Sequence, residues 1–165
     1  MKSLLKITLL VAPFYIFSQQ YDFPENYKLD TKEDYIKYRE DIVKSTDWLV
    51  AAPANRHYEK RKRINAFILE WVSGESDLSV NINSDVAEIT GDDDLYMIFI
   101  GGWAKHVIEN DEIENEELEG NIAGIKSIIT YYSKNKSILG KNKAIEKYVK
   151  LYDKGKLENY IISKF

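Results

Sequence analysis

The segment 93–110, DDLYMIFIGGWAKHVIEN, is apolar on nearly every side when it is drawn as a helix. A helix without a polar face must be surrounded by other parts of the chain. Gly101 and Gly102 each weaken a helix by about 1 kcal/mol relative to Ala, so they predict that a neighbouring element approaches this backbone closely. We therefore interpret 93–110 as the central helix of a bundle. One face carries Leu95, Ile98, Phe99, Gly102, Trp103, His106 and Val107, and the other carries Met97, Ile100, Ala104 and Ile108.

Two helices are predicted before this segment. The first begins at Thr31, where Asp34 three residues later suits a capping box, and it ends near Ala52 because Pro53 disfavours helix in the residue before it. The second ends at Gly74. The apolar stripe of the first comprises Tyr35, Tyr38, Ile42, Thr46 and Leu49, and that of the second comprises Ile64, Phe67, Ile68, Trp71 and Val72.

The remaining pattern completes an all-α fold. Residues 78–83 alternate in polarity, which predicts a crossing loop, and a turn of helix follows at 85–89. Asp92 or Asp93 caps the central helix. A fourth helix spans Leu118 to Tyr132, a last helix spans 144–152 with Tyr152 facing inward, and a short turn follows at 157–161. We expect an irregular bundle of about five helices around the central one.

The N-terminal stretch predicts export. Residues 1–18 have two lysines, an apolar run and Ser18 as a small residue for cleavage, which is typical of a signal peptide; an uncleaved anchor or a buried helix is the alternative. Residues 19–30 are expected to form an extended leader, and 31–165 a single helical domain. We therefore expect a periplasmic or extracellular protein without a stable membrane anchor after cleavage.

Composition restricts the chemistry of the chain. It has no Cys and two His, so thiol chemistry and disulfides are excluded, and a His-rich metal site is disfavoured. Of the 23 basic residues, Lys2 and Lys6 lie in the predicted signal, so 21 basic residues face 27 acidic ones, a net charge of −6. This charge argues against nucleic-acid binding and against binding to anionic membranes.

Four stretches resemble a group of small secreted proteins common in Bacteroidota. They are NAFILEWVSG at Asn65–Gly74, MIFIGGWAKHVIEN at Met97–Asn110, EGNIAGIKSII at Glu119–Ile129 and LGKNKAIEKYVKLYDKGKL at Leu139–Leu157. The resemblance implies a bacterial source and an exported protein. The group has no assigned activity, so the resemblance implies no catalytic residue.

His106 is one candidate for chemistry, because it lies on the main apolar face of the central helix. A pocket beside His106, Trp103 and Asn121 would suit an envelope hydrolase or a carrier of small ligands. The alternative is that His106 is a core residue with its ring nitrogens hydrogen-bonded, and that Asn121 and Asn65 are buried amides serving the fold. No catalytic residue, metal site or cofactor is assigned.

Seven acidic residues lie between Glu109 and Glu119. Their spacing does not fit an EF-hand, because Glu116 stands where that loop requires Gly. A solvated helix start and a negative surface for a partner remain as interpretations. The candidate partner-binding residues are Glu112, Glu114, Glu116, Glu117 and Glu119.

A basic segment, 56–63, has the opposite charge. Arg56, Lys60 and Arg63 share one side of a helix and could receive an anionic group. We favour instead an intramolecular contact between this segment and the acidic one. The leading hypothesis for function is a non-enzymatic domain that binds a protein partner, with an immunity-like or inhibitory role as one form of it. An envelope hydrolase or ligand carrier and a structural envelope protein are the alternatives.

Overall fold

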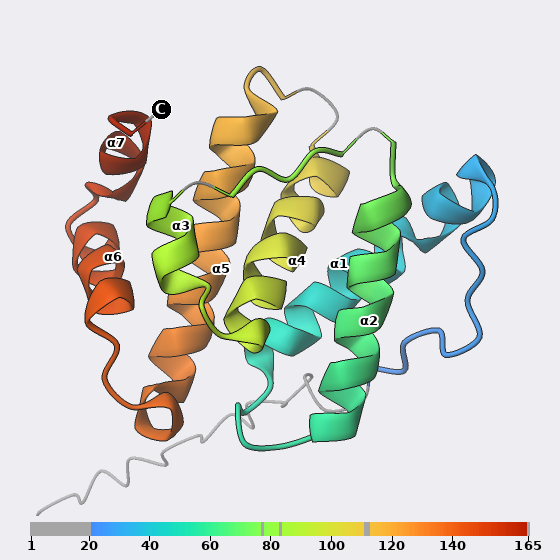
Figure 1. Cartoon of the computed structure of the whole chain (residues 1–165), viewed down its shortest axis with the longest axis horizontal. Helices are drawn as coiled ribbons and strands as arrows, with labels where there is room; N and C mark the ends of the chain where they lie inside the picture. The colour runs from blue at the N-terminus through green and yellow to red at the C-terminus, as the bar shows by residue number, and fades with distance from the viewer. Residues whose placement is uncertain (1–20, 77, 83, 111–112, 165) are drawn as a thin grey trace, which may run out of the picture.

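The computed structural model describes residues 21–76, 78–82, 84–110 and 113–164, which form seven helices and no strand (Figure 1). The predicted all-α bundle is confirmed. Five helices are long and two, α3 and α7, are short. The helices are α1 (Lys32–Ala51), α2 (Tyr58–Gly74), α3 (Ser84–Ile89), α4 (Asp93–Glu109), α5 (Glu116–Leu139), α6 (Lys143–Asp153) and α7 (Leu157–Ile162).

Local capping signals set the helix boundaries. The Thr31 hydroxyl accepts a hydrogen bond from the Asp34 amide at 3.3 Å, and the Asp34 carboxylate accepts one from the Thr31 amide at 3.0 Å, so the predicted capping box is present. Asp92 caps α4, because its Oδ1 accepts hydrogen bonds from the amides of Asp94 and Leu95. The alternative cap, Asp93, lies inside the helix.

Helix α4 lies at the centre of the bundle. Every residue from Met97 to Ala104 is buried. Helices α1, α2 and α5 pack against it, and Figure 1 shows it between α5 on one side and α2 on the other. The all-round apolar pattern of this segment is therefore explained by neighbours on several sides.

Glycines permit the closest of these contacts. A methyl group at Gly101 would lie 2.8 Å from Thr46 Oγ1 on α1, and one at Gly102 would lie 3.2 Å from the carbonyl oxygen of Ala123 on α5. From the other side, a methyl group at Gly124 would lie 2.9 Å from the carbonyl oxygen of Phe99. The prediction that neighbours approach the backbone at Gly101 and Gly102 is confirmed.

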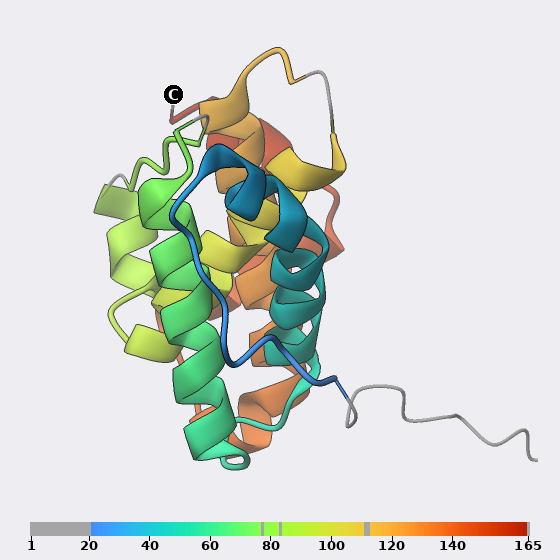
Figure 2. The ribbon, with the colours of Figure 1, turned by 90° about the vertical axis from the view of Figure 1, so that its right-hand side faces the viewer.

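The segment from Tyr21 to Asp30 runs across α1 and α2 (Figure 2). Phe23 is buried, and the Tyr27 ring packs on Phe67 with centroids 4.6 Å apart. The Tyr27 hydroxyl donates to Glu70 at 2.8 Å, and that of Tyr21 donates to the Asp41 carbonyl at 3.0 Å. Aromatic side chains thus attach this segment to the bundle.

The predicted signal peptide, 1–18, lies outside the described residues. In the part of the chain that the structure describes, no helix combines the length and the apolar character needed to cross a bilayer.

Helix α6 packs on α5 through Ile145 and Tyr148. The expectation that Tyr152 faces inward is wrong, because this side chain is 50% exposed. Helix α7, which follows the turn at Gly155, packs on both α5 and α6 and buries Leu157 and Ile161 there instead.

Replacing Gly124 by Ala tests the close packing of α4 on α5. The added methyl group meets the Phe99 backbone, which cannot move without shifting α4, so Gly124→Ala is expected to lower the free energy of unfolding by about 1–3 kcal/mol. Chemical denaturation measures this. Gly91→Ala is the matched control, because a methyl group at Gly91 has no atom within 4 Å. Equal stability of the two variants would contradict close packing.

Alkaline pH tests the burial of the leader tyrosines. Burial raises the pKa of Tyr21 to about 12, and burial together with Glu70 raises that of Tyr27 to about 12. A raised folded-state pKa gives stability that is complete below the unfolded-state pKa of about 10 and is lost as the pH rises toward 12. We expect the free energy of unfolding to fall across this window, and to fall less in Tyr21→Phe. Absorbance titration in which all tyrosines ionise near pH 10 would contradict this burial.

Candidate functional site

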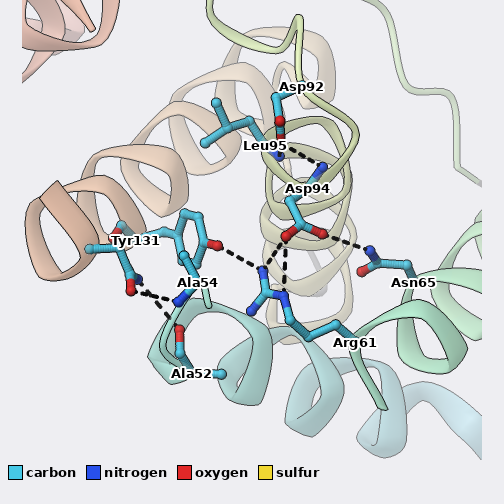
Figure 3. A network of polar contacts seen from close by, with 9 residues as sticks. Ala52, Ala54, Arg61, Asn65, Asp92, Asp94, Leu95 and Tyr131 are labelled. Atoms are coloured by element: carbon cyan, nitrogen blue, oxygen red, sulfur yellow. Dashed lines mark hydrogen bonds and ion pairs between the residues drawn. The ribbon is translucent and has the colours of Figure 1, made fainter. Parts of the chain in front are cut away.

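A buried arginine joins three helices. Arg61 on α2 is 3% exposed, and its Nε and Nη2 donate to Asp94 Oδ2 on α4 at 3.1 and 2.9 Å (Figure 3). Its Nη2 also donates to the hydroxyl of Tyr131 on α5 at 2.8 Å. One side chain therefore connects α2, α4 and α5.

The carboxylate of Asp94 is held on both oxygens. Asn65, one turn after Arg61, donates from Nδ2 to Asp94 Oδ1 at 3.2 Å. Asp94 also lies in the first turn of α4, where the helix dipole favours a negative charge. Burial raises the pKa of Tyr131, and Arg61 opposes that rise, so the Tyr131 hydroxyl stays neutral at ordinary pH.

A second set of hydrogen bonds attaches the α1–α2 connection to α5. Asn135 is 2% exposed, and its Oδ1 accepts from the Ala54 amide at 2.8 Å. Its Nδ2 donates to the carbonyl oxygens of Tyr131 and Ala52. The connection that leads into α2 is thus held to α5 through its backbone, and α2 itself is held through Arg61.

These polar residues border a groove between α2 and α4 with a volume of about 620 Å³. We call it the α2–α4 groove. Its α4 side includes Asp93, Tyr96 and Met97, with Asp92 just before the helix. Tyr58 is 74% exposed and Leu69 is 44% exposed. The α2 side presents Tyr58, Lys62, Ala66 and Leu69, which recur at helical spacing along one face.

The groove combines apolar contact area with charge at its rim. Asp92, Asp93 and Lys62 are exposed, and Arg61 Nη1 and Asn65 Oδ1 are buried with no hydrogen-bond partner among the described residues. About half of the residues that line the groove are charged or polar, and the others offer apolar contact area beside these fixed polar groups. The arrangement therefore suits recognition of another molecule.

His106 lies away from this groove, on the last turn of α4. Its side chain is 26% exposed, and Nε2 lies 3.2 Å from Glu119 Oε2. The Asn110 amide nitrogen lies 3.3 Å from Nδ1, so in the neutral ring Nδ1 accepts from Asn110 and Nε2 donates to Glu119. The expectation that the ring nitrogens of His106 are hydrogen-bonded is confirmed, but the side chain is only partly buried, because the last turn of α4 extends beyond the buried stretch that ends at Ala104.

Trp103 and Asn121 are buried, whereas the His106 side chain is partly exposed. Trp103 is fully buried with its ring against Gly120, so protein atoms fill the space between α4 and α5 there. Asn121 is 1% exposed and donates from Nδ2 to the Glu117 carbonyl at 2.8 Å. It borders a separate indentation of about 10 Å³, room for little more than one water molecule.

The candidate acidic residues have different surroundings. Glu116 Oε1 accepts from the Ser79 amide at 3.4 Å, and Glu119 contacts His106, whereas Glu114 and Glu117 are exposed. Glu112 lies outside the described residues. Glu116, Glu117 and Glu119 occupy the first turn of α5, where the positive end of the helix dipole stabilises negative charge.

Among the described residues, no ion pair joins the basic segment to the acidic one, which does not favour an intramolecular contact between them. Arg61 pairs with Asp94, and Arg63 pairs with Glu25 of the leader. Figure 1 shows the starts of α2 and α5 at opposite ends of the bundle. The charges along the sequence could not reveal which side chains pair, because the pairing depends on how the helices are oriented in the bundle.

Metal ligands do not cluster in the described part of the chain. No group of three His, Asp or Glu side chains there is arranged to hold an ion.

Comparison with known proteins identifies no relative. No family model matches the chain, and no curated protein or solved structure is significantly similar to it. The resemblance to exported proteins of Bacteroidota therefore stays a prediction.

A double-mutant cycle tests the Arg61–Asp94 pair. Asp94→Asn leaves the Arg61 charge buried and is expected to cost about 3 kcal/mol of unfolding free energy, the lower end for a buried pair because Asp94 is partly exposed. Combined with Arg61→Met, it should show a coupling energy of about 0.5–3 kcal/mol. Arg63→Met, which breaks the exposed pair with Glu25, is the control and should cost less than about 1 kcal/mol. Additive effects of Asp94→Asn and Arg61→Met on the free energy of unfolding would contradict the coupling.

Proposed function

We propose that the chain is a non-enzymatic, exported helical domain that binds a protein partner in the α2–α4 groove. The observation that carries this proposal is the exposure of two large apolar residues on α2, Tyr58 and Leu69, along a groove of about 620 Å³. Large exposed apolar residues that line a groove are typical of interaction sites.

The ion pair beneath the groove supports the proposal. Arg61 holds α2 to both α4 and α5, so the distance between the two walls of the groove is set before a partner arrives. A preformed site avoids part of the entropy cost of ordering on binding. Burying Arg61 is unfavourable for folding, but its ion pair fixes the shape of the binding surface.

The shape and chemistry of the groove favour an amphipathic segment of the partner. Ala66 and Leu69 offer contact to apolar side chains, and a groove between two helices suits an amphipathic helix of the partner. Asp92 and Asp93 are exposed at the rim and would pair with basic residues of that segment. The proposed partner is therefore basic, but the acidic residues that meet it are Asp92 and Asp93 rather than Glu112 to Glu119.

Selection from a displayed random-peptide library tests this function. Peptides that bind the full chain are compared on two variants, Leu69→Gln and Leu139→Gln. The two leucines are 44% and 40% exposed, but only Leu69 lines the α2–α4 groove. We expect Leu69→Gln to weaken binding roughly tenfold, as loss of about 1.4 kcal/mol of apolar contact would, and Leu139→Gln to leave it unchanged.

Selected peptides should carry apolar residues at helical spacing together with Lys or Arg. If no peptide discriminates between the two variants, the groove is not the binding site. If no peptide from the library binds the chain, that result would instead favour the structural envelope role.

A further inference from the structure

A row of lysines lies along one face of α6. Lys143, Lys147, Lys150 and Lys154 recur at i, i+4, i+7 and i+11, and Lys141 precedes the helix. All five are exposed, and they line a shallow groove of about 450 Å³ that also includes Leu151 and Tyr160. We call this surface the lysine groove.

Positive charge is concentrated in this part of the chain. From Lys134 to Lys164 there are nine lysines and three acidic residues, although the whole chain has a net charge of −4. The carboxylate that lines the lysine groove, Glu146, is already paired with Lys136 at 2.7 Å, and that lysine holds the pKa of Glu146 below its usual range. The groove therefore presents several positive charges to solvent.

We infer that the lysine groove is a second interaction surface, which takes an extended acidic segment of a polypeptide. Eleven residues of helix separate Lys143 from Lys154, a distance of about 16 Å. About five residues of extended chain cover that length. Carboxylates along such a segment meet the row of ammonium groups, while Leu151 contacts its apolar atoms.

Two features favour an acidic polypeptide over other polyanions. Lys147 and Lys164 lie 4.7 and 5.7 Å from the Tyr160 ring centroid, so cations already occupy the aromatic ring on which a nucleic-acid base would stack. The rest of the chain is strongly acidic, so a duplex or an anionic membrane extending past the groove would meet repulsion. A short acidic segment contacts the lysines alone.

This surface is independent of the proposed function. In Figure 1, α6 and α7 lie on the opposite side of α5 from α2, so the lysine groove and the α2–α4 groove face different sides of the bundle. Loss of one site is expected to leave the other intact. The lysine groove also differs in partner chemistry, because it selects acidic segments whereas Asp92 and Asp93 select basic ones.

Titration of the ¹⁵N-labelled full chain with hexaglutamate, followed by NMR at low ionic strength, tests the inference. We expect amide shifts concentrated in residues 141–154, and an affinity that falls steeply as salt approaches about 0.15 M. Shifts elsewhere on the bundle, or none, would overturn the inference.

Matched charge variants locate the site. Lys150→Gln with Lys154→Gln should weaken hexaglutamate binding roughly fivefold or more, since two exposed ion pairs are lost. Lys28→Gln with Lys37→Gln removes the same charge from exposed positions outside both grooves and should leave binding unchanged. Equal weakening by both pairs would mean that net charge alone governs binding and would overturn the inference.

Competing polyanions complete the test. An oligothymidylate with the same number of negative charges, and vesicles containing anionic lipid, are titrated in parallel. Weaker binding of both than of hexaglutamate supports a polypeptide partner, whereas equal or tighter binding of either would overturn that assignment.

Discussion

The close approach of α4 to its neighbours is the constraint on which the rest of the structure depends. Gly101 and Gly102 bring the backbone of α4 against α1 and α5, and Gly124 on α5 accepts Phe99 from the other side. Each glycine costs about 1 kcal/mol in helix propensity, but the contact lets α4 be buried from Met97 to Ala104. The other elements are arranged around this buried helix.

The position of α4 also explains the buried ion pair. Once α4 is packed against α5, its first turn places Asp94 where Arg61 of α2 and Tyr131 of α5 meet. A buried pair of this kind adds little net stability compared with apolar residues, but losing one partner is costly. The pair is therefore better understood as a device that fixes α2 relative to α4, and with it the shape of the α2–α4 groove.

The two proposed interaction surfaces have opposite chemistry. One combines apolar contact area with acidic residues, Asp92 and Asp93, at the rim, and the other is a row of lysines on α6. A domain with binding surfaces on two sides can connect two partners, which increases the effective concentration of one near the other. The nine lysines after Ser133 are visible in the sequence, but the net negative charge of the whole chain conceals their local effect.

The sequence by itself determined the helices. The caps at Thr31 and Asp92, the turns near Gly74 and Gly140, and the apolar period of 93–110 act within a few residues, so they can be read from neighbouring positions. The close approach at Gly101 and Gly102 was also predictable, because no helix needs two adjacent glycines for its own stability. What was not predictable is the site. Arg61 and Asp94 are 33 positions apart, and the exposure of His106 depends on where the buried part of α4 ends. Only the tertiary structure decided these features, since an ion pair or a groove between helices requires knowing which helix faces lie together, and that depends on the packing of the whole bundle.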